Sequence, residues 1–261
     1  MQEDGQAHEM SLSPTTGAPT NASSAQRTMS HRAPPRMRSS ISEIIADNQA
    51  FILPFLVFSG LFLTLIGIYG NAPLFLCVNS YHSTTSDFIF LRLTNLGDGI
   101  IAVLLILALC WVSYRDALIF LLITILITIT INILRSHIFP ELIRPVAYFG
   151  TSELLHIVPG YKPPMLGTFP SGHTATAFSV GLYLSLFMQN RITKFLLFMG
   201  ALMVGYSRIY LSAHFPADVV VGATIGVFMT LGCFYLGRFF RSPWMDKKIT
   251  YRPRLFIRQP S

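Results

Sequence analysis

Residues 117–135 read ALIFLLITILITITINILR, and no charged side chain interrupts this stretch before Arg135 at its end. A helix needs about 20 mostly apolar residues to cross the hydrocarbon core of a bilayer. The stretch therefore predicts a transmembrane helix that ends on an arginine.

Five further apolar blocks accompany this one along the chain. Polar breaks at Tyr114–Asp116 and Gln189–Arg191 predict tight hairpins, and Pro216 begins the last helix at a position where proline is tolerated. We therefore predict an all-α membrane protein, a bundle of six transmembrane helices. The six blocks are 50–69, 98–114, 117–135, 173–189, 193–212 and 217–239.

The composition agrees with a membrane domain between two polar tails. Of the 261 residues, 52% are hydrophobic and 12% are charged, whereas soluble domains carry about 25% charged residues. Residues 1–48, rich in small polar side chains and ending in a basic cluster, predict a disordered basic cytoplasmic tail. Residues 49–240 then form the transmembrane domain, and residues 241–261 form a second basic cytoplasmic tail.

The distribution of positive charge predicts the orientation in the membrane. With six spans, both tails and both tight hairpins share one side, and that side carries fourteen of the nineteen Lys and Arg residues. Because cytoplasmic segments carry an excess of Lys and Arg, we expect both termini in the cytoplasm. The basic tails are expected to contact anionic lipid and not nucleic acid. Five basic residues remain for the outer side: Arg92, Arg135, Arg144, Lys162 and Arg208.

Ionisable residues at membrane depth mark a functional site by default. Three stretches on the predicted outer side carry the residue types that phosphoryl transfer requires. Arginine presents a fixed fork of donors and a permanent charge to a phosphate. A helix N-terminus presents free N–H groups to an anion. The three stretches are Arg144-Pro145, Pro170-Ser171-Gly172-His173, and Ser207-Arg208 followed by His214 and Asp218.

Two histidines in these stretches supply the remaining chemistry. One must be neutral to attack phosphorus, and the other must be protonated to release the leaving oxygen; histidine can do either near neutral pH. Asp218 follows His214 by four residues, so its carboxylate is expected to accept the N–H of one ring nitrogen and leave the other free to attack.

These motifs, in this order and on one predicted membrane face, resemble the signature of the type 2 phosphatidic acid phosphatase (PAP2) superfamily. The resemblance covers about residues 50–240, and SR-x5-H-x3-D matches at every defined position. It implies the six-helix fold of the PAP2/haloperoxidase-like type and a phosphohistidine on His214, which Asp218 orients. It further implies that His173 is the general acid, with no cofactor and no metal. The implied phosphate ligands are Arg144, Arg208, Ser171 and Gly172.

One position departs from the family pattern. The first motif usually has a lysine, six residues and then Arg-Pro, and the lysine position here is His137. Arg135 replaces this lysine if the turn after the third span is lengthened. Arg135 can instead be an ordinary interfacial anchor, and His137 a structural residue.

Several other residues have structural interpretations beside functional ones. His82 and His156 are expected to be structural or solvated, and Lys162 either a solvated loop residue or a contact to a second phosphate. Asp98 is expected to cap the second span, with a contact to the catalytic bundle as the alternative. Gly222 and Gly226 form a small-xxx-small pair that predicts close helix packing.

The resulting hypothesis is a metal-independent phosphatase that hydrolyses a lipid phosphomonoester or diphosphate at the outer (periplasmic) face of a bacterial inner (plasma) membrane. Undecaprenyl diphosphate, phosphatidylglycerophosphate, phosphatidate and lipid A phosphates remain open as substrates, and the oligomeric state is open too. The main alternative is a lipid phosphotransferase that passes the phosphoryl group to an acceptor lipid. A haloperoxidase and a non-catalytic lipid-binding protein are less favoured, because the chain has six apolar blocks and keeps both histidines.

Overall fold

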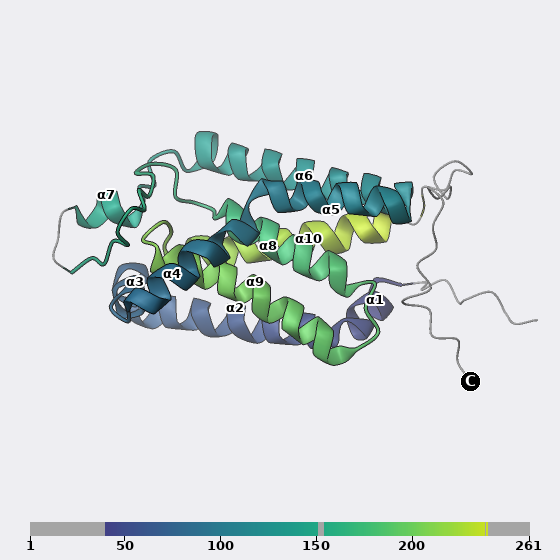
Figure 1. The fold of residues 1–261 in the computed structure, drawn as a ribbon, viewed down its shortest axis with the longest axis horizontal. Coiled ribbons are helices and arrows are strands. Elements are labelled where there is room, and N and C mark those ends of the chain that lie inside the picture. Colours follow the sequence, from purple (N-terminus) through teal and green to yellow (C-terminus); the bar gives the residue numbers. More distant parts are fainter. Residues whose placement is uncertain (1–39, 151–153, 238, 240–261) are drawn as a thin grey trace, which may run out of the picture. The chain divides into compact units, whose positions relative to one another are not determined.

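A computed structural model describes the chain at residues 40–150, 154–237 and 239, and helices dominate these residues (Figure 1). The expectations for residues 1–39 and 241–261 lie outside the described part. The elements are α1 (Ile41–Asp47), α2 (Gln49–Tyr69), α3 (Asn71–Asn79), α4 (Thr84–Leu93), η1 (Thr94–Gly97), α5 (Gly99–Val112), α6 (Tyr114–Ile133), η2 (Leu134–Ile138), α7 (Pro145–Phe149), α8 (Gly172–Ser185), α9 (Arg191–Tyr210) and α10 (Pro216–Gly237).

The six predicted blocks coincide with α2, α5, α6, α8, α9 and α10, but the prediction of six membrane spans is not confirmed. Among the described residues, four helices are long and apolar enough to cross a membrane: α2, α6 with η2, α9 and α10. A fifth span results if α4 with η1 and α5, which bend by 51° at their junction, count as one. The central helix α8 has only 14 residues, fewer than a full crossing needs.

Capping residues explain where several helices begin. The Ser113 hydroxyl accepts a hydrogen bond from the Asp116 amide (3.3 Å) at the start of α6. The Asn190 side chain accepts one from the Ile192 amide (2.7 Å) at the start of α9. Pro216 is the first residue of α10, as predicted. These side chains satisfy helix N–H groups that have no partner within the helix.

Residues 41–47 differ from the prediction that the first 48 residues are disordered. They form α1, whose first turn is capped by the Ser40 hydroxyl at the Glu43 amide (3.3 Å). Ile44 is buried in the main hydrophobic core, and the Asn48 side-chain amide donates to its carbonyl (2.9 Å). One buried isoleucine and one buried asparagine therefore extend the packed domain into the segment assigned to the tail.

The core is built around α8, which packs against both α9 and α10. A Cβ atom at Gly222 would collide with the Ser171 carbonyl oxygen, and one at Gly226 would collide with that of Ala175. The two glycines thus let α10 lie directly against the backbone of α8, as the small-xxx-small pattern predicted. On its other side α8 contributes Phe178, whose ring contacts an aromatic cluster of Phe51, Phe55, Phe58 and Phe198.

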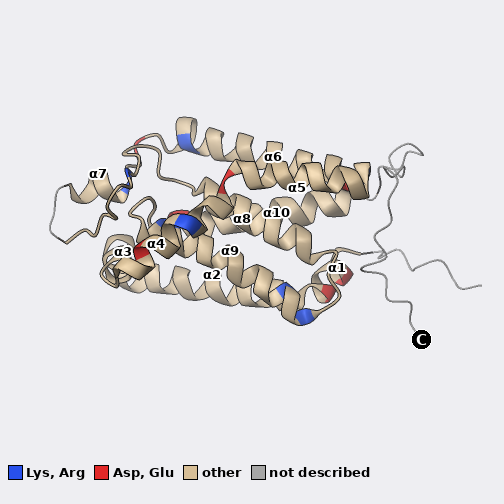
Figure 2. Cartoon of the chain, in the orientation of Figure 1, with Lys and Arg blue, Asp and Glu red and all other residues tan. Residues whose placement is uncertain are grey.

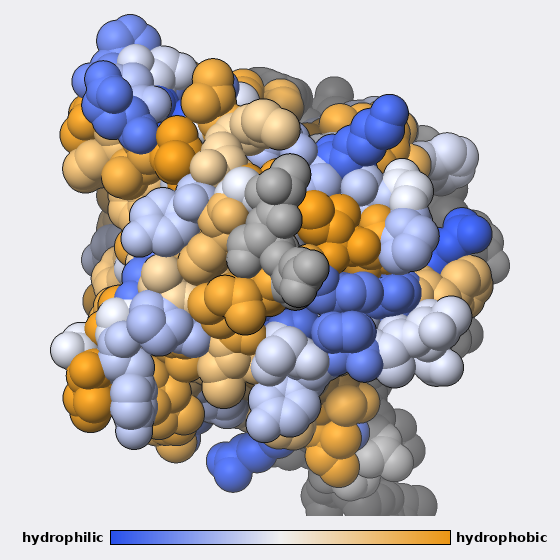
Figure 3. Space-filling model, turned by 90° about the vertical axis from the view of Figure 1, so that its left-hand side faces the viewer, coloured by the Kyte–Doolittle hydropathy of each residue, from blue (hydrophilic) through white to orange (hydrophobic). Residues whose placement is uncertain are grey.

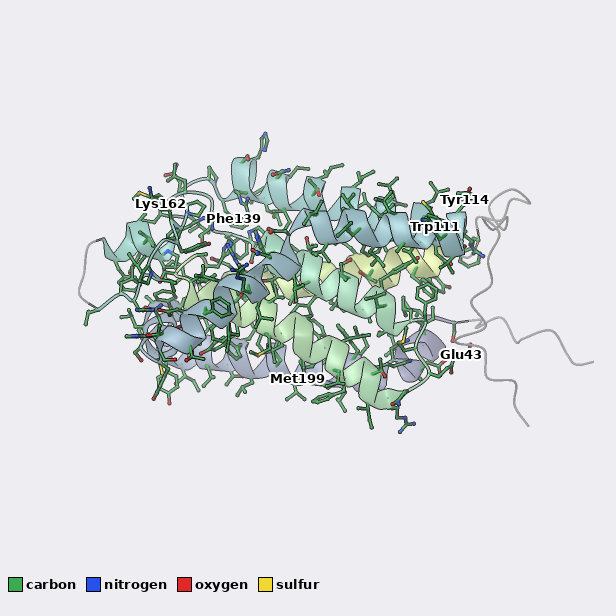
Figure 4. All side chains as sticks on the ribbon, in the orientation of Figure 1. Glu43, Trp111, Tyr114, Phe139, Lys162 and Met199 are labelled. Carbon is green, nitrogen blue, oxygen red and sulfur yellow. The ribbon has the colours of Figure 1, made fainter. Side chains whose placement is uncertain are left out.

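The outer surfaces of the bundle are apolar. Large hydrophobic side chains are exposed along α2, α5 and α6, among them Leu53, Val57, Leu104, Leu107 and Ile125. Charged residues lie toward the ends of the long helices, and the middle stretches of α2, α6 and α10 are uncharged (Figure 2). Trp111 and Tyr114 lie at one end of the bundle and Lys162 at the other (Figure 4). This arrangement is that of an integral membrane protein.

Candidate active site

The predicted site residues converge at one end of the bundle, away from α1 and the end of α10 (Figure 1). They come from η2, the segment before α7, the N-terminus of α8, the end of α9, the turn after it and the first turn of α10. A hydrophilic patch lies to the right of the centre of this end, with apolar residues beside it (Figure 3).

His214 lies in the turn between α9 and α10 and is 1% exposed. Its Nδ1 faces Asp218 Oδ2 at 3.4 Å, and its Nε2 lies 3.4 Å from Arg144 Nη1. Both histidine distances are longer than an ideal hydrogen bond. The His214 amide donates to the Arg208 carbonyl (3.1 Å), which holds the turn against the end of α9.

Burial lowers the pKa of His214 to about 3, with the charges of Arg144 and Arg208 acting in the same direction and Asp218 against them. The neutral ring is therefore the stable form around neutral pH. A neutral imidazole with Nδ1–H directed at a carboxylate keeps a lone pair on Nε2.

Asp218 lies in the first turn of α10 and is held by more than His214. Its Oδ2 accepts a hydrogen bond from the Phe215 amide (2.9 Å) and a short one from the Thr168 hydroxyl. Its carbonyl oxygen accepts from the Ser171 amide (3.0 Å), which joins α10 to the N-terminus of α8. The sequence analysis did not identify Thr168, because a threonine in the loop before α8 belongs to none of the three motifs.

Arg144 is 6% exposed, and its guanidinium is fixed mainly by backbone oxygens. Nε donates to the Leu166 carbonyl (3.0 Å), Nη2 to that of Gly167 (3.1 Å), and Nη1 to that of Ala213 (3.0 Å). Burial, with the charges of neighbouring arginines, lowers its pKa to about 10, so it stays protonated at neutral pH. Arg144 therefore locks the loop before α8 to the turn that carries His214.

Arg208, near the end of α9, is 4% exposed and is nearly surrounded by protein. Its Nη1 donates to the Thr94 hydroxyl of η1 (2.5 Å), and Nε has no hydrogen-bond partner among the described residues. A buried guanidinium with an unused donor is costly unless an anion completes it. Thr94 is a second contact that the sequence did not reveal.

Ser171 and Gly172 lie at the N-terminus of α8, as predicted. The Ser171 hydroxyl is the cap of this helix and contacts the Thr174 amide (3.4 Å) and hydroxyl (2.9 Å). A Cβ atom at Gly172 would meet nothing closer than Ile131 at 3.9 Å, so the glycine leaves the entrance of the helix open.

His173, the second residue of α8, forms an ion pair whose nitrogen Nε2 lies 2.6 Å from Asp98 Oδ1. Asp98 occupies the N-cap position of α5, as predicted, but its side chain makes no capping hydrogen bond within the described structure. The carboxylate faces the predicted general acid instead, which was the alternative interpretation.

Arg135 and His137 fall in different environments. The α6 helix ends in the π-helical turn η2, which holds more residues than an α-helical turn. Arg135 Nη2 donates to the Pro170 carbonyl (3.1 Å), and its stem lies against Gly167, whose φ of +64° and missing Cβ make the contact possible. Its Nε has no hydrogen-bond partner among the described residues. His137 is exposed.

The other outer residues lie apart from these contacts. His156 Nε2 pairs with Asp87 Oδ1 (2.9 Å), and its ring stacks on that of His82 with centroids 3.8 Å apart. Lys162 is exposed in the loop before α8. The arrangement as a whole is a set of buried or half-buried arginines around a neutral histidine that a carboxylate orients, which suits attack on a bound anion.

Comparison with known proteins points in the same direction. A sequence model of the PAP2 superfamily matches residues 116–242. A lipid A 4'-phosphatase of Bacteroides thetaiotaomicron is 35% identical over 77 residues, which are 30% of this chain and 34% of that protein. The chain thus matches about a third of that relative's length. An undecaprenyl-diphosphatase of Sulfolobus acidocaldarius is 28% identical over 67% of this chain and 84% of its own length. Among solved structures, LpxE of Aquifex aeolicus is 30% identical, with a TM-score of 0.56 over 63% of this chain and 94% of that one.

Proposed function

Because this chain belongs to the PAP2 superfamily, we propose that it is a membrane phosphatase that hydrolyses a phosphomonoester or diphosphate carried on a lipid. The observation that carries the proposal is the placement of His214 between the Asp218 carboxylate and the Arg144 guanidinium. The names of the relatives, lipid A 4'-phosphatase and undecaprenyl-diphosphatase, support a lipid phosphate as the substrate class.

In the proposed first step, the Nε2 lone pair of His214 attacks phosphorus and the bond from phosphorus to the lipid oxygen breaks. Asp218 holds the proton on Nδ1 and stabilises the positive charge that develops on the ring. The His173 imidazolium gives its proton to the leaving oxygen. In the second step, water gives a proton back to His173 and attacks the phosphohistidine, which releases phosphate and restores neutral His214.

The arginines are proposed to bind the phosphoryl oxygens. Within the described part of the chain the Nε groups of Arg208 and Arg135 have no hydrogen-bond partner, so they offer donors to an anion, and the first N–H groups of α8 at Gly172 add a helix N-terminus. Charge on the transferring group is spread over three oxygens, so preorganised positive charge is the main catalytic device. No step of this scheme uses a metal ion.

The orientation is proposed from the charge distribution and the fold together. In Figure 1, α1 and the end of α10 lie at the end of the bundle opposite to α7 and the site loops. If the basic tails remain in the cytoplasm, the site faces the outer side, in a bacterium the periplasmic face of the inner membrane.

Phosphate release tests this function directly. Detergent-purified protein is given a panel of lipid monophosphates and diphosphates with EDTA present, and the His214→Ala variant serves as the control. We expect release from at least one lipid, a loss of at least about 10³-fold in the variant, and inhibition by vanadate. Inhibition by EDTA that magnesium reverses would refute the metal-free scheme. Consumption of substrate only with an acceptor lipid, without free phosphate, would identify the phosphotransferase instead.

A further inference from the structure

The bend between α4 and α5 brings a short turn into contact with the site. Within η1, the Thr94 hydroxyl accepts a hydrogen bond from Arg208 Nη1 (2.5 Å). A Cβ atom at Gly97 would lie 2.7 Å from the His173 carbonyl oxygen and 3.0 Å from the His173 Cβ. The backbone of the turn therefore lies against the first turn of α8, and this contact requires glycine.

Asp98 follows this glycine, and its side chain serves a different purpose from the usual one. An aspartate before a helix ordinarily accepts a hydrogen bond from the first-turn N–H groups. Within the described structure, the Asp98 carboxylate makes no such bond to α5, and Oδ1 lies 2.6 Å from His173 Nε2. The Asp98 carboxylate is thus directed away from its own helix and toward the proposed general acid.

Charges around His173 give this contact a chemical consequence. Burial lowers the pKa of the His173 imidazole, the charges of Arg208 and Arg144 act in the same direction, and Asp98 acts against them, in favour of the proton. A general acid must carry its proton when the leaving oxygen departs. In a site built to concentrate positive charge, the second histidine therefore needs a carboxylate of its own.

We propose that Asp98 is a positioning residue that keeps His173 protonated and oriented for proton transfer to the leaving oxygen, an inference that rests on the proposed function. The imidazolium has two N–H groups. Asp98 holds the one on Nε2, and the one on Nδ1 goes to the leaving oxygen. When water attacks the phosphohistidine, Nδ1 takes a proton back, so the ion pair is restored after each turnover.

A merely structural role fits the contact less well. The side chains of His173 and Asp98 are 33% and 42% exposed, and an ion pair at that exposure contributes little to folding. The pair also lies at the end of α5 that is bent by 51° relative to α4, where a capping bond would serve stability better.

The test compares Asp98→Asn with Asp87→Asn, a matched control on α4 whose carboxylate pairs with His156 Nε2 at 2.9 Å. Each variant is assayed on the lipid phosphate that wild type hydrolyses, whose alkoxide leaving group needs a proton, and on 4-nitrophenyl phosphate, whose leaving group does not. For Asp98→Asn we expect kcat on the lipid to fall at least about 10-fold, with less than about 3-fold change on 4-nitrophenyl phosphate. The alkaline limb of the pH profile on the lipid should move to lower pH, because the remaining charges act against the proton. Asp87→Asn should leave both substrates and the profile near wild type.

A double-mutant cycle shows whether Asp98 acts through His173. In a His173→Ala background, Asp98→Asn should cause no further loss on the lipid substrate. Asp98→Glu keeps the carboxylate and should recover part of the rate. This variant also provides a second test of the inference if Asp98→Asn folds poorly. Equal losses on both substrates, an unchanged pH profile or additive losses in the cycle would overturn the inference and leave the phosphatase standing. Absence of phosphate release by wild type from every substrate would overturn the proposed function and, with it, this inference.

Discussion

Replacing Thr168 by valine removes one hydroxyl while nearly keeping the size of the side chain. This hydroxyl donates a short hydrogen bond to Asp218 Oδ2, the same oxygen that faces His214 Nδ1 and accepts from the Phe215 amide. A hydrogen bond to a charged group contributes about 1.5–3 kcal/mol. At about 1.4 kcal/mol per factor of ten, the full loss corresponds to roughly a 10- to 150-fold fall in rate.

We expect Thr168→Val to lower kcat by about 10-fold or more, because a less firmly held carboxylate orients His214 less well. The assay is phosphate release under saturating lipid substrate. Thr224→Val is the matched control. Thr224 lies on α10, as Asp218 does, but its hydroxyl donates to the Val220 carbonyl of that helix (2.8 Å) and not to Asp218. Thr168→Ser keeps a hydroxyl and should retain most of the activity. A kcat for Thr168→Val within twofold of wild type would refute the reasoning.

Three further predictions concern the nucleophile, the family departure and the helix contact. With a pKa of about 3, His214 should give the nitrogen chemical shifts of a neutral ring at pH 5. An unperturbed histidine is about 97% protonated at that pH. A change of the His214 nitrogen shifts to imidazolium values near pH 6.5 would contradict this prediction. Arg135→Ala should lower kcat/KM at least about 10-fold by removing a charged donor, whereas His137→Ala should stay near wild type, and the reverse order would assign the role to His137. Gly222→Ala should lower the detergent-solubilised Tm, since overpacking typically costs about 1–3 kcal/mol, whereas Gly232→Ala, which has open space at its Cβ, should not.

Sequence reasoning reached the residues that have a fixed spacing within one segment. His214 and Asp218 are four residues apart at a helix start, so their contact follows from local geometry. Ser171 and Gly172 open a helix, and Gly222 and Gly226 pack against its backbone, for similarly local reasons.

Contacts between distant segments that no motif marks were not predicted from the sequence. Thr168 and Thr94 bind Asp218 and Arg208 across 50 and 114 residues, and threonine is too common a residue to signal such a partner. The bend at η1 likewise depends on how Gly97 fits against α8 and not on any periodic pattern. The count of six spans is not confirmed for a related reason: apolar composition does not distinguish a short helix packed among its neighbours, such as the 14-residue α8, from a helix long enough to cross the bilayer.

Arg208 contributes to the site in two separable ways. Its guanidinium faces the site, and its carbonyl oxygen accepts the amides of Ala213 and His214 (3.0 and 3.1 Å). The carbonyl belongs to the main chain, so a substitution that keeps the helix, which excludes proline, keeps the geometry of the turn that carries the nucleophile. An Arg208→Met protein should therefore fold with His214 correctly placed and yet lack one of the guanidinium groups that are proposed to bind the phosphate. Position 208 is thus suitable for separating phosphate binding from the positioning of the nucleophile.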